Sequence, residues 1–278
     1  MRFFQKIGDI WRHEELRQKL GVTLGLILVY RVGSFIVLPG VNSDVLAEQM
    51  SQLGSGGLGD ILSLFTGGAF TRASIFALGI MPYISASIIM QLLTIVLPQL
   101  ESLKKEGQAG QRKITQYTRY GTVVLATFQA LSIAVALESQ PGLVIDPGLL
   151  FRATAVITLV TGTMFLMWLG EQITERGLGN GISIIIFAGI VASAPSNLAQ
   201  LLTTTTQPIY NAILFVVIVL VTIVTIVFIQ EGVRRIPVQY GKRVRGRKQY
   251  GGASTHIPLR VNPVGMIPLI FAQSIITF

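Results

Sequence analysis

The sequence contains no cysteine and only two histidines, His13 and His256, which lie far apart in the chain. Disulfide bonds, thiolate nucleophiles and thiolate metal sites are therefore excluded, and two distant histidines do not predict a metal cluster. Charge is also scarce, because 13% of the 278 residues are charged, about half the share in soluble domains. Hydrophobic residues make up 51%, and the mean hydropathy is +0.63. This composition excludes an ordinary soluble enzyme and indicates a membrane protein.

Catalytic motifs are missing as well. No zinc-protease, serine-hydrolase or P-loop motif occurs, and no Asp or Glu lies near the middle of a hydrophobic run. Gly54, Gly56 and Gly59 satisfy the dinucleotide-binding pattern, but they lie between two hydrophobic runs and not in a βαβ unit. We therefore expect neither enzymatic activity nor a cofactor. The lack of acidic residues inside the runs also argues against an ion-coupled transporter.

Six hydrophobic runs approach the length that crosses a bilayer core of about 30 Å. They cover residues 21–38, 74–97, 120–137, 153–170, 178–194 and 209–229. Arg31 interrupts the first run, Pro82 lies inside the second, and we expect Pro195 to end the fifth. A seventh run begins near Met266 and stops at Phe278, so we interpret the chain as part of a longer protein. Because an isolated strand cannot satisfy its backbone in lipid, the spans are expected to be helical.

The predicted organisation has three parts. Residues 1–20 place aromatic and aliphatic side chains along one helical stripe, which suits a cytoplasmic helix lying in the membrane interface; a solvated tail is the alternative. Residues 21–194 form a first group of five helices, and residues 195–278 begin a second group. Within the second group, residues 231–263 predict a basic cytoplasmic hairpin, with Gly251-Gly252 as the candidate turn.

Basic residues are distributed unevenly over the predicted loops. Of the 22 Lys and Arg residues, 19 lie before the first run or in the segments after the second, fourth and sixth runs. Arg72 and Arg152 are the basic residues of the opposite loops. By the positive-inside rule, the N-terminus is therefore cytoplasmic. Arg31, inside the first run, is expected to extend toward the membrane surface or to pair with a carboxylate.

Between the first two runs, a short apolar stretch is flanked by glycines. Residues 54–70 are too short to span the membrane and too apolar for a solvated loop. Irregular backbone at membrane depth must be covered by protein or water, so the segment favours a re-entrant element. A disordered glycine linker is the alternative.

Isoleucines recur at one-turn spacing in the second and fifth runs. Ile80 and Ile84 form one pair, and Ile182 and Ile186 form the other, after Asn180 as a candidate helix N-cap. Residues at i and i+4 share a helix face, and a ring of such faces can form a hydrophobic constriction. Core or lipid-facing packing is the simpler explanation of the spacing alone.

Positive charge is concentrated in residues 231–263, which carry eight Lys and Arg residues together with Tyr240 and Tyr250. That density exceeds what orientation in the membrane requires. A protruding hairpin of this composition would offer a cationic surface to phosphates or to an acidic partner. Binding to anionic lipids is the alternative.

Four stretches of the sequence resemble the bacterial SecY family, the core subunits of the protein-conducting translocon. They are residues 72–93, 104–121, 162–192 and the basic segment 231–263. The resemblance extends along essentially the whole chain and implies a ten-span channel built as two inverted halves around a central pore. This chain would supply the first half, the sixth span and the start of the seventh. The expected fold class is therefore an all-α polytopic membrane protein with a re-entrant plug helix at about residues 57–70.

The resemblance also implies roles for individual residues. The plug would contain Leu58, Ile61, Leu62, Leu64 and Phe65. The pore ring would contain Ile80, Ile84, Ile182, Ile186 and Ile270. The lateral gate would include Ser85, Gln129, Gln273 and Phe278. The docking surface for the ribosome or the SecA motor would include Arg235, Lys242, Arg243, Arg247 and Lys248.

The function implied by the resemblance is that of the central pore subunit of the Sec translocon in the inner membrane of a bacterium. Such a subunit passes unfolded secretory polypeptides across the membrane and releases transmembrane segments sideways into lipid, driven by SecA or the ribosome. The expected partners are SecE and SecG, the SecA motor, the ribosome with its RNA, the nascent chain or signal sequence, and membrane lipids. A small-solute secondary transporter is the alternative, although it would need a polar site at the midplane. An intramembrane enzyme is a more distant one.

Overall fold

The computed structural model describes most of the chain from His13 onward. The described residues are 13–42, 45–46, 66–204, 208–238, 243–245, 248–250, 255–262 and 265. The chain divides into two compact units, Met1–Ser196 and Asn197–Phe278, and each is described by itself.

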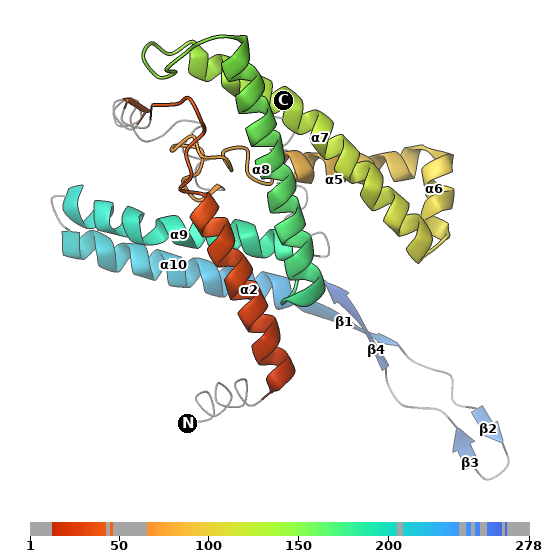
Figure 1. The fold of residues 1–278 in the computed structure, drawn as a ribbon. Helices are drawn as coiled ribbons and strands as arrows, with labels where there is room; N and C mark the ends of the chain where they lie inside the picture. The colour runs from red at the N-terminus through yellow and green to blue at the C-terminus, as the bar shows by residue number, and fades with distance from the viewer. Residues whose placement is uncertain are drawn as a thin grey trace. The chain divides into compact units, whose positions relative to one another are not determined.

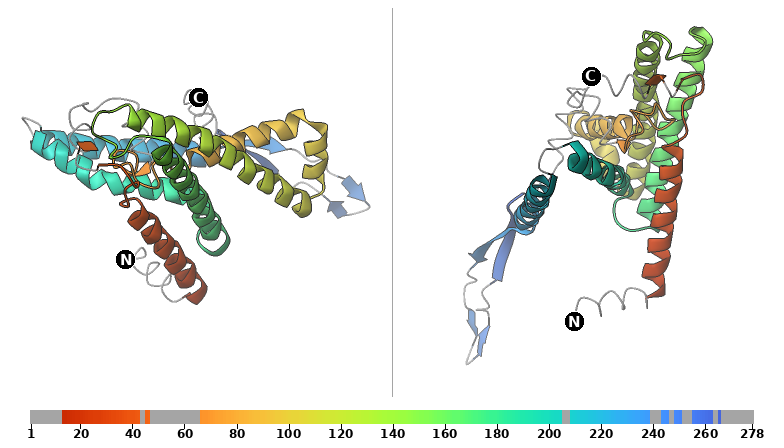
Figure 2. Two further views of the ribbon diagram at one scale, coloured as in Figure 1. Left: turned by 45° about the horizontal axis from the view of Figure 1, so that its top comes forward. Right: turned by 90° about the vertical axis from the view of Figure 1, so that its left-hand side faces the viewer.

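Helices dominate the described chain (Figure 1). The first unit contains α2 (Glu14–Gly33), α5 (Met81–Val96), α6 (Pro98–Lys105), α7 (Gln108–Glu138) and α8 (Leu149–Arg176). Helix α9 (Gly181–Thr204) begins in the first unit and ends in the second, which continues with α10 (Pro208–Glu231). Helices α2 and α8 lie side by side (Figure 2), and α7 packs against both α5 and α8.

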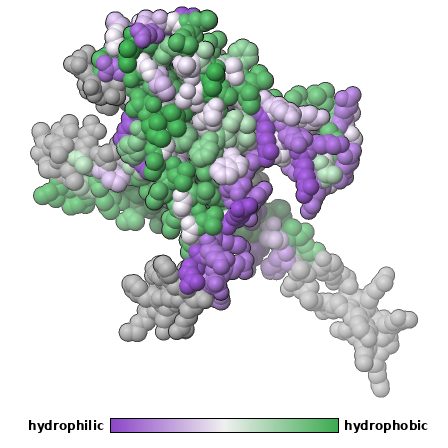
Figure 3. Space-filling view, viewed as in Figure 1, coloured by the Kyte–Doolittle hydropathy of each residue, from purple (hydrophilic) through white to green (hydrophobic). Residues whose placement is uncertain are grey.

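Three of the described helices, α7, α8 and α10, are long and apolar enough to cross a membrane. Helices α5 and α6 form a fourth candidate as a pair, although their axes are bent by 98°. The predicted third, fourth and sixth runs lie within α7, α8 and α10. Hydrophobic residues cover the sides of α2 and α8, whereas hydrophilic residues gather at the start of α2 and around α6 (Figure 3).

The second hydrophobic run is helical only from Met81 onward. Residues 74–80 form turns, and Gly79 has a φ of 58°, a left-handed conformation that does not belong to a helix. Pro82 lies in the first turn of α5, where the missing backbone donor would have no helical partner. The prediction that the whole run forms one helix was therefore wrong for residues 74–80.

Helix α7 buries a stripe of small residues against its neighbours. The stripe recurs at every fourth position and consists of Thr118, Thr122, Ala126, Ala130 and Ala134. Small side chains allow membrane helices to approach closely, since no hydrophobic force drives helices together within lipid. The Thr122 hydroxyl donates to the Thr118 carbonyl at 2.8 Å, so its buried polar group is satisfied within the helix.

Helix α9 continues through Pro195 to Thr204, although we expected this proline to end it. Proline removes one backbone donor and disturbs the preceding turn, but the residues after it resume the helix. The boundary between the compact units follows directly, after Ser196. Pro195 therefore marks the passage of α9 from one unit to the other, and the predicted termination was wrong.

The basic segment of the second unit forms two antiparallel ladders. Strand β1 (Val233–Val238) pairs with β4 (Thr255–Arg260), and β2 (Arg243–Arg245) pairs with β3 (Lys248–Tyr250). Both ladders have the same register, in which Val238 opposes Thr255 and Arg245 opposes Lys248. The chain therefore reverses between Arg245 and Lys248, which corrects the expected turn at Gly251-Gly252.

Candidate functional site

The described members of the predicted pore ring come from the starts of α5 and α9. Ile80 directly precedes α5 and is buried, and the Ile84 amide donates to the Ile80 carbonyl at 3.1 Å. Asn180 caps α9, because its Oδ1 atom accepts hydrogen bonds from the amides of Ile182 at 3.1 Å and Ser183 at 3.3 Å. The predicted N-cap is therefore confirmed, and it fixes the position of Ile182 in the first turn of the helix.

Three of the five predicted ring residues meet in one apolar cluster. Ile80 belongs to its buried core, and Ile84 and Ile182 pack against that core. The remaining buried members are Tyr30, Ala69, Phe76, Leu166, Leu169, Ile173 and Ile185. Ile186 is half-buried one turn further along α9, and Ile270 lies outside the described residues. The cluster is compatible with a ring and with simple core packing.

The predicted plug residues Leu58, Ile61, Leu62, Leu64 and Phe65 lie outside the described residues. The described segment that follows, residues 66–76, is hydrogen-bonded to the residues that follow α2. The Ile75 amide donates to the Ile36 carbonyl at 2.9 Å, and the Leu38 amide donates to the Ala73 carbonyl at 2.9 Å. This segment is thus held in place by tertiary hydrogen bonds.

Arg31 does not pair with a carboxylate in the described structure. Its Nη1 atom donates to the Gly67 carbonyl at 2.9 Å, and its guanidinium carbon lies 5.1 Å from the centre of the Phe35 ring. Arg72 approaches the same ring at 4.5 Å. Sequence reasoning missed the contact with Gly67, although the presence of one charge inside a hydrophobic run was a signal that Arg31 needs a polar partner.

The two predicted gate residues that are described lie on different helices. Ser85 is buried on α5, next to Ala86. Helix α7 approaches α5 closely here, because a Cβ atom added at Gly121 of α7 would lie 3.6 Å from the Cβ atom of Ala86. Gln129 is half-buried about two turns beyond Gly121 on α7. The structure thus shows the packed α5–α7 seam, with Ser85 in it, while Gln273 and Phe278 lie outside the described residues.

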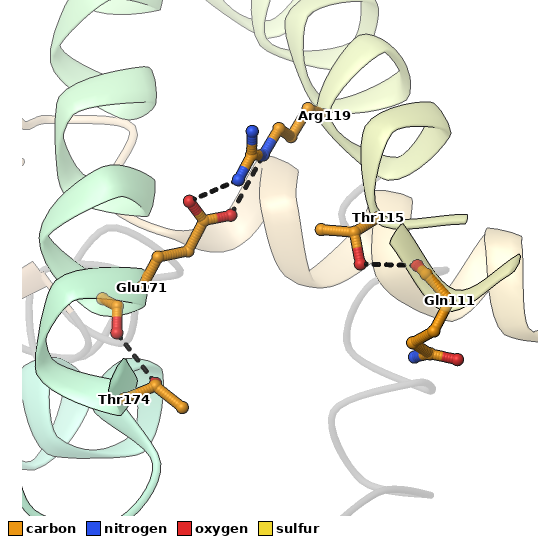
Figure 4. Close-up of polar contacts among 6 residues, drawn as sticks. Gln111, Thr115, Arg119, Glu171 and Thr174 are labelled. Atoms are coloured by element: carbon orange, nitrogen blue, oxygen red, sulfur yellow. Dashed lines mark hydrogen bonds and ion pairs between the residues drawn. The ribbon is translucent and has the colours of Figure 1, made fainter. Parts of the chain in front are cut away.

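Two ion pairs connect α8 to α7, and neither was predicted. Arg119 binds Glu171 with two hydrogen bonds, from Nε to Oε1 at 3.1 Å and from Nη2 to Oε2 at 2.7 Å (Figure 4). At the other end of the helix pair, Arg152 Nε donates to Glu138 Oε2 at 2.6 Å. Each pair joins residues on two different helices, so the spacing of charges along a single helix could not predict either pair.

Basic side chains are exposed on the described part of the hairpin. Arg235 of β1 is exposed, as are Arg234 and Arg260. Arg243 and Lys248 occupy strands β2 and β3, whereas Lys242 and Arg247 lie outside the described residues. Within the described ranges, no group of three or more His, Cys, Asp or Glu residues could hold a metal ion.

These features define a polytopic helical membrane protein with an apolar cluster between its helices and a basic hairpin after its last described helix. A family model described as SecY matches residues 74–278, so the chain belongs to the SecY family. The protein translocase subunit SecY of Escherichia coli strain K12 is 57% identical over 270 residues. That alignment covers 95% of this chain and 61% of the relative, so the chain spans about three fifths of the relative's length.

Solved structures confirm the fold class. One is a SecY protein whose plug domain is described as stabilising the closed state of the translocation channel. It is 19% identical to this chain with a TM-score of 0.57, and the match covers 94% of this chain and 56% of that one. Another is Sec61 in the canine ribosome–channel complex, with 17% identity and a TM-score of 0.56, covering 93% of this chain and 56% of that one. The predicted SecY-type channel fold is therefore confirmed.

Proposed function

We propose that this chain forms the pore of a Sec translocon, through which unfolded secretory polypeptides cross the cytoplasmic membrane of a bacterium. Membership of the SecY family supports this proposal. The observation that carries it is the apolar cluster in which Ile80, Ile84 and Ile182 meet. A narrow apolar waist holds a moving polypeptide weakly and excludes water when empty.

In this mechanism the channel itself is passive. A motor or a translating ribosome supplies the force, and the isoleucine ring, completed by Ile186 and Ile270, limits ion leakage around the chain. Leu58, Ile61, Leu62, Leu64 and Phe65 form the plug that fills the outer vestibule at rest. Transmembrane segments leave toward lipid between α5 and α7 on one side and the start of the seventh span on the other. Ser85, Gln129, Gln273 and Phe278 lie at this lateral gate.

The basic hairpin serves as the docking surface for the cytosolic partner. Its base carries exposed arginines, and five residues are the predicted contacts. Their positive charges can bind the phosphates of ribosomal RNA or an acidic surface of the SecA motor. Those five are Arg235, Lys242, Arg243, Arg247 and Lys248. The uneven distribution of basic residues supports a cytoplasmic location for this hairpin and for the N-terminus. SecE and SecG are the proposed membrane partners.

Cysteine crosslinking tests the function directly, because the chain contains no cysteine of its own. In the full-length protein, with any cysteine outside this chain replaced, Ile84→Cys and Ile186→Cys each provide a single thiol in the proposed ring. We expect a secretory polypeptide stalled during export to form crosslinks with both positions. Phe128→Cys is the matched control, because Phe128 is a 63% exposed position on α7 that is expected to face lipid.

A transporter of small solutes would give a different result. A stalled polypeptide would then crosslink to none of the three cysteines, or to all of them alike. Either outcome would contradict the proposed pore.

A further inference from the structure

Two neighbouring side chains of α2 bind two consecutive backbone carbonyls of the turn 66–68. The Tyr30 hydroxyl donates to the Thr66 carbonyl at 3.1 Å, and Arg31 Nη1 donates to the Gly67 carbonyl at 2.9 Å. Tyr30 is only 3% exposed, so its hydroxyl reaches the turn from within the apolar cluster. We refer to Tyr30, Arg31 and these two carbonyls as the α2 latch.

The latched turn is also confined from the opposite side by α9. Gly67 has a φ of 63°, and a Cβ atom there would lie 2.9 Å from the Cα atom of Gly189 and 3.3 Å from Arg31 Nη1. Only glycine fits this left-handed position between a guanidinium and a helix backbone. The turn is therefore held between α2 and α9 at the level of the apolar cluster.

Hydrogen bonds connect the turn to the residues that follow it and fix their positions relative to it. The Phe70 amide donates to Thr66 Oγ1 at 3.2 Å, and the Ser74 amide donates to the Ala69 carbonyl at 2.9 Å. Gly79 contacts the turn from the far end of this segment, since a Cβ atom at Gly79 would lie 2.9 Å from Thr66 Cγ2. Gly79 directly precedes Ile80, so the turn packs next to the first of the two predicted ring isoleucines at the start of α5.

We propose that Tyr30 and Arg31 are positioning residues that hold the turn 66–68 against α9 and thereby stabilise the sealed state of the channel. This inference rests on the proposed function, in which the turn is the last part of the plug. Moving the turn away from α2 breaks a neutral and a charge-assisted hydrogen bond at the same time. A bond from a charged donor contributes more than one from a neutral donor, so Arg31 is expected to carry the larger share.

The test uses the full-length channel with its partners in lipid vesicles. Arg31→Ala is expected to speed amide hydrogen exchange in residues 66–76 and to raise the resting ion leak about ten-fold. Tyr30→Phe keeps the buried ring and should raise the leak a few-fold. Arg31→Lys retains a donor and should give an intermediate leak, which also separates a lost hydrogen bond from a misfolded protein.

Arg72→Ala is the matched control, because Arg72 is exposed and contacts the Phe35 ring from the neighbouring position. It should leave both exchange and leak unchanged. Unchanged exchange in Arg31→Ala would overturn the latch itself. Faster exchange without a larger leak would overturn its role in sealing. Failure of the Ile84→Cys and Ile186→Cys channels, with Tyr30 and Arg31 intact, to crosslink a stalled polypeptide would instead refute the proposed function, and the exchange data would still decide whether the latch exists.

Discussion

Helices α7 and α10 are both long enough and apolar enough to cross a membrane, yet they differ in how they are packed. Of the most apolar 18-residue window, 22% is buried in α7 and none is buried in α10. Helix α7 carries the stripe of alanines and threonines at every fourth position, whereas α10 has Val, Ile, Leu and Phe around its whole circumference. Apolar content thus indicates a span, and the spacing of small residues indicates which spans pack against helices of the same unit.

The comparison has an energetic consequence. Where backbones approach closely, an added methyl group meets an atom that cannot move away. Where large side chains face outward, added bulk changes little within the chain. Substitutions that add volume should therefore separate the two kinds of helix, and the following predictions proceed from the largest expected effect to the smallest.

Gly162→Ala should have the largest effect. A Cβ atom at Gly162 of α8 would collide with the carbonyl oxygen of Ile75, which is backbone and cannot rotate away. We expect a loss of about 3 kcal/mol or more in the free energy of unfolding, because overpacking forces the surrounding structure to shift. Thermal unfolding in detergent micelles measures the change.

Gly25→Ala in α2 is the matched control for this substitution. A Cβ atom at Gly25 would have no heavy atom within 4 Å. Alanine is the better helix former, so stability should rise by up to about 1 kcal/mol. If both glycine substitutions destabilised the protein equally, close packing at Gly162 would not be the cause.

Ala126→Leu compares the stripe of α7 with α10 directly. Ala126 is fully buried, and a larger side chain there must push α7 away from its neighbours, at a cost of about 1–3 kcal/mol. Thr222→Leu makes a smaller addition of bulk at an exposed position of α10 and should change stability by less than about 0.5 kcal/mol. Chemical unfolding of both variants in the same micelles makes the comparison. Equal losses would show that α10 is packed as tightly as α7.

Sequence reasoning located the helices well because the hydrophobic runs at residues 120–137, 153–170 and 209–229 depend on composition along a single helix. It failed where the structure depends on contacts between distant residues. Residues 74–80 are apolar enough for a helix, but they form turns that follow the left-handed Gly67 and the contacts of residues 66–76 with α2 and with the residues just after it. No local pattern predicts which carbonyl Arg31 will bind.

The same distinction applies to the candidate site. The one-turn relation between Ile80 and Ile84 could be predicted from the sequence, because it lies within one stretch of chain. That Ile182 joins them depends on the Asn180 cap and on the packing of α9 against α8, where a Cβ atom at Gly170 would lie 3.1 Å from Ile182 Cγ1. The hairpin turn was misplaced for a related reason, since the register of two strands is set by their pairing and not by a glycine pair alone.

The smallest predicted effect concerns the ion pair between Arg119 of α7 and Glu171 of α8. Both oxygens of Glu171 accept hydrogen bonds, and its side chain is 20% exposed, so the pair is more shielded from solvent than the exposed Lys105–Glu101 pair of α6. Glu171→Gln should cost about 1 kcal/mol, because a bidentate bond between charges becomes a single neutral acceptor. Glu101→Gln, at a 52% exposed position, should cost only a few tenths of a kcal/mol. Unfolding in low and high salt separates them further: screening should remove the small effect at Glu101 and leave most of the effect at Glu171. Equal costs at both positions would mean that the Arg119–Glu171 pair does not hold α7 to α8, and that the small-residue stripe and the Arg152–Glu138 pair account for their packing.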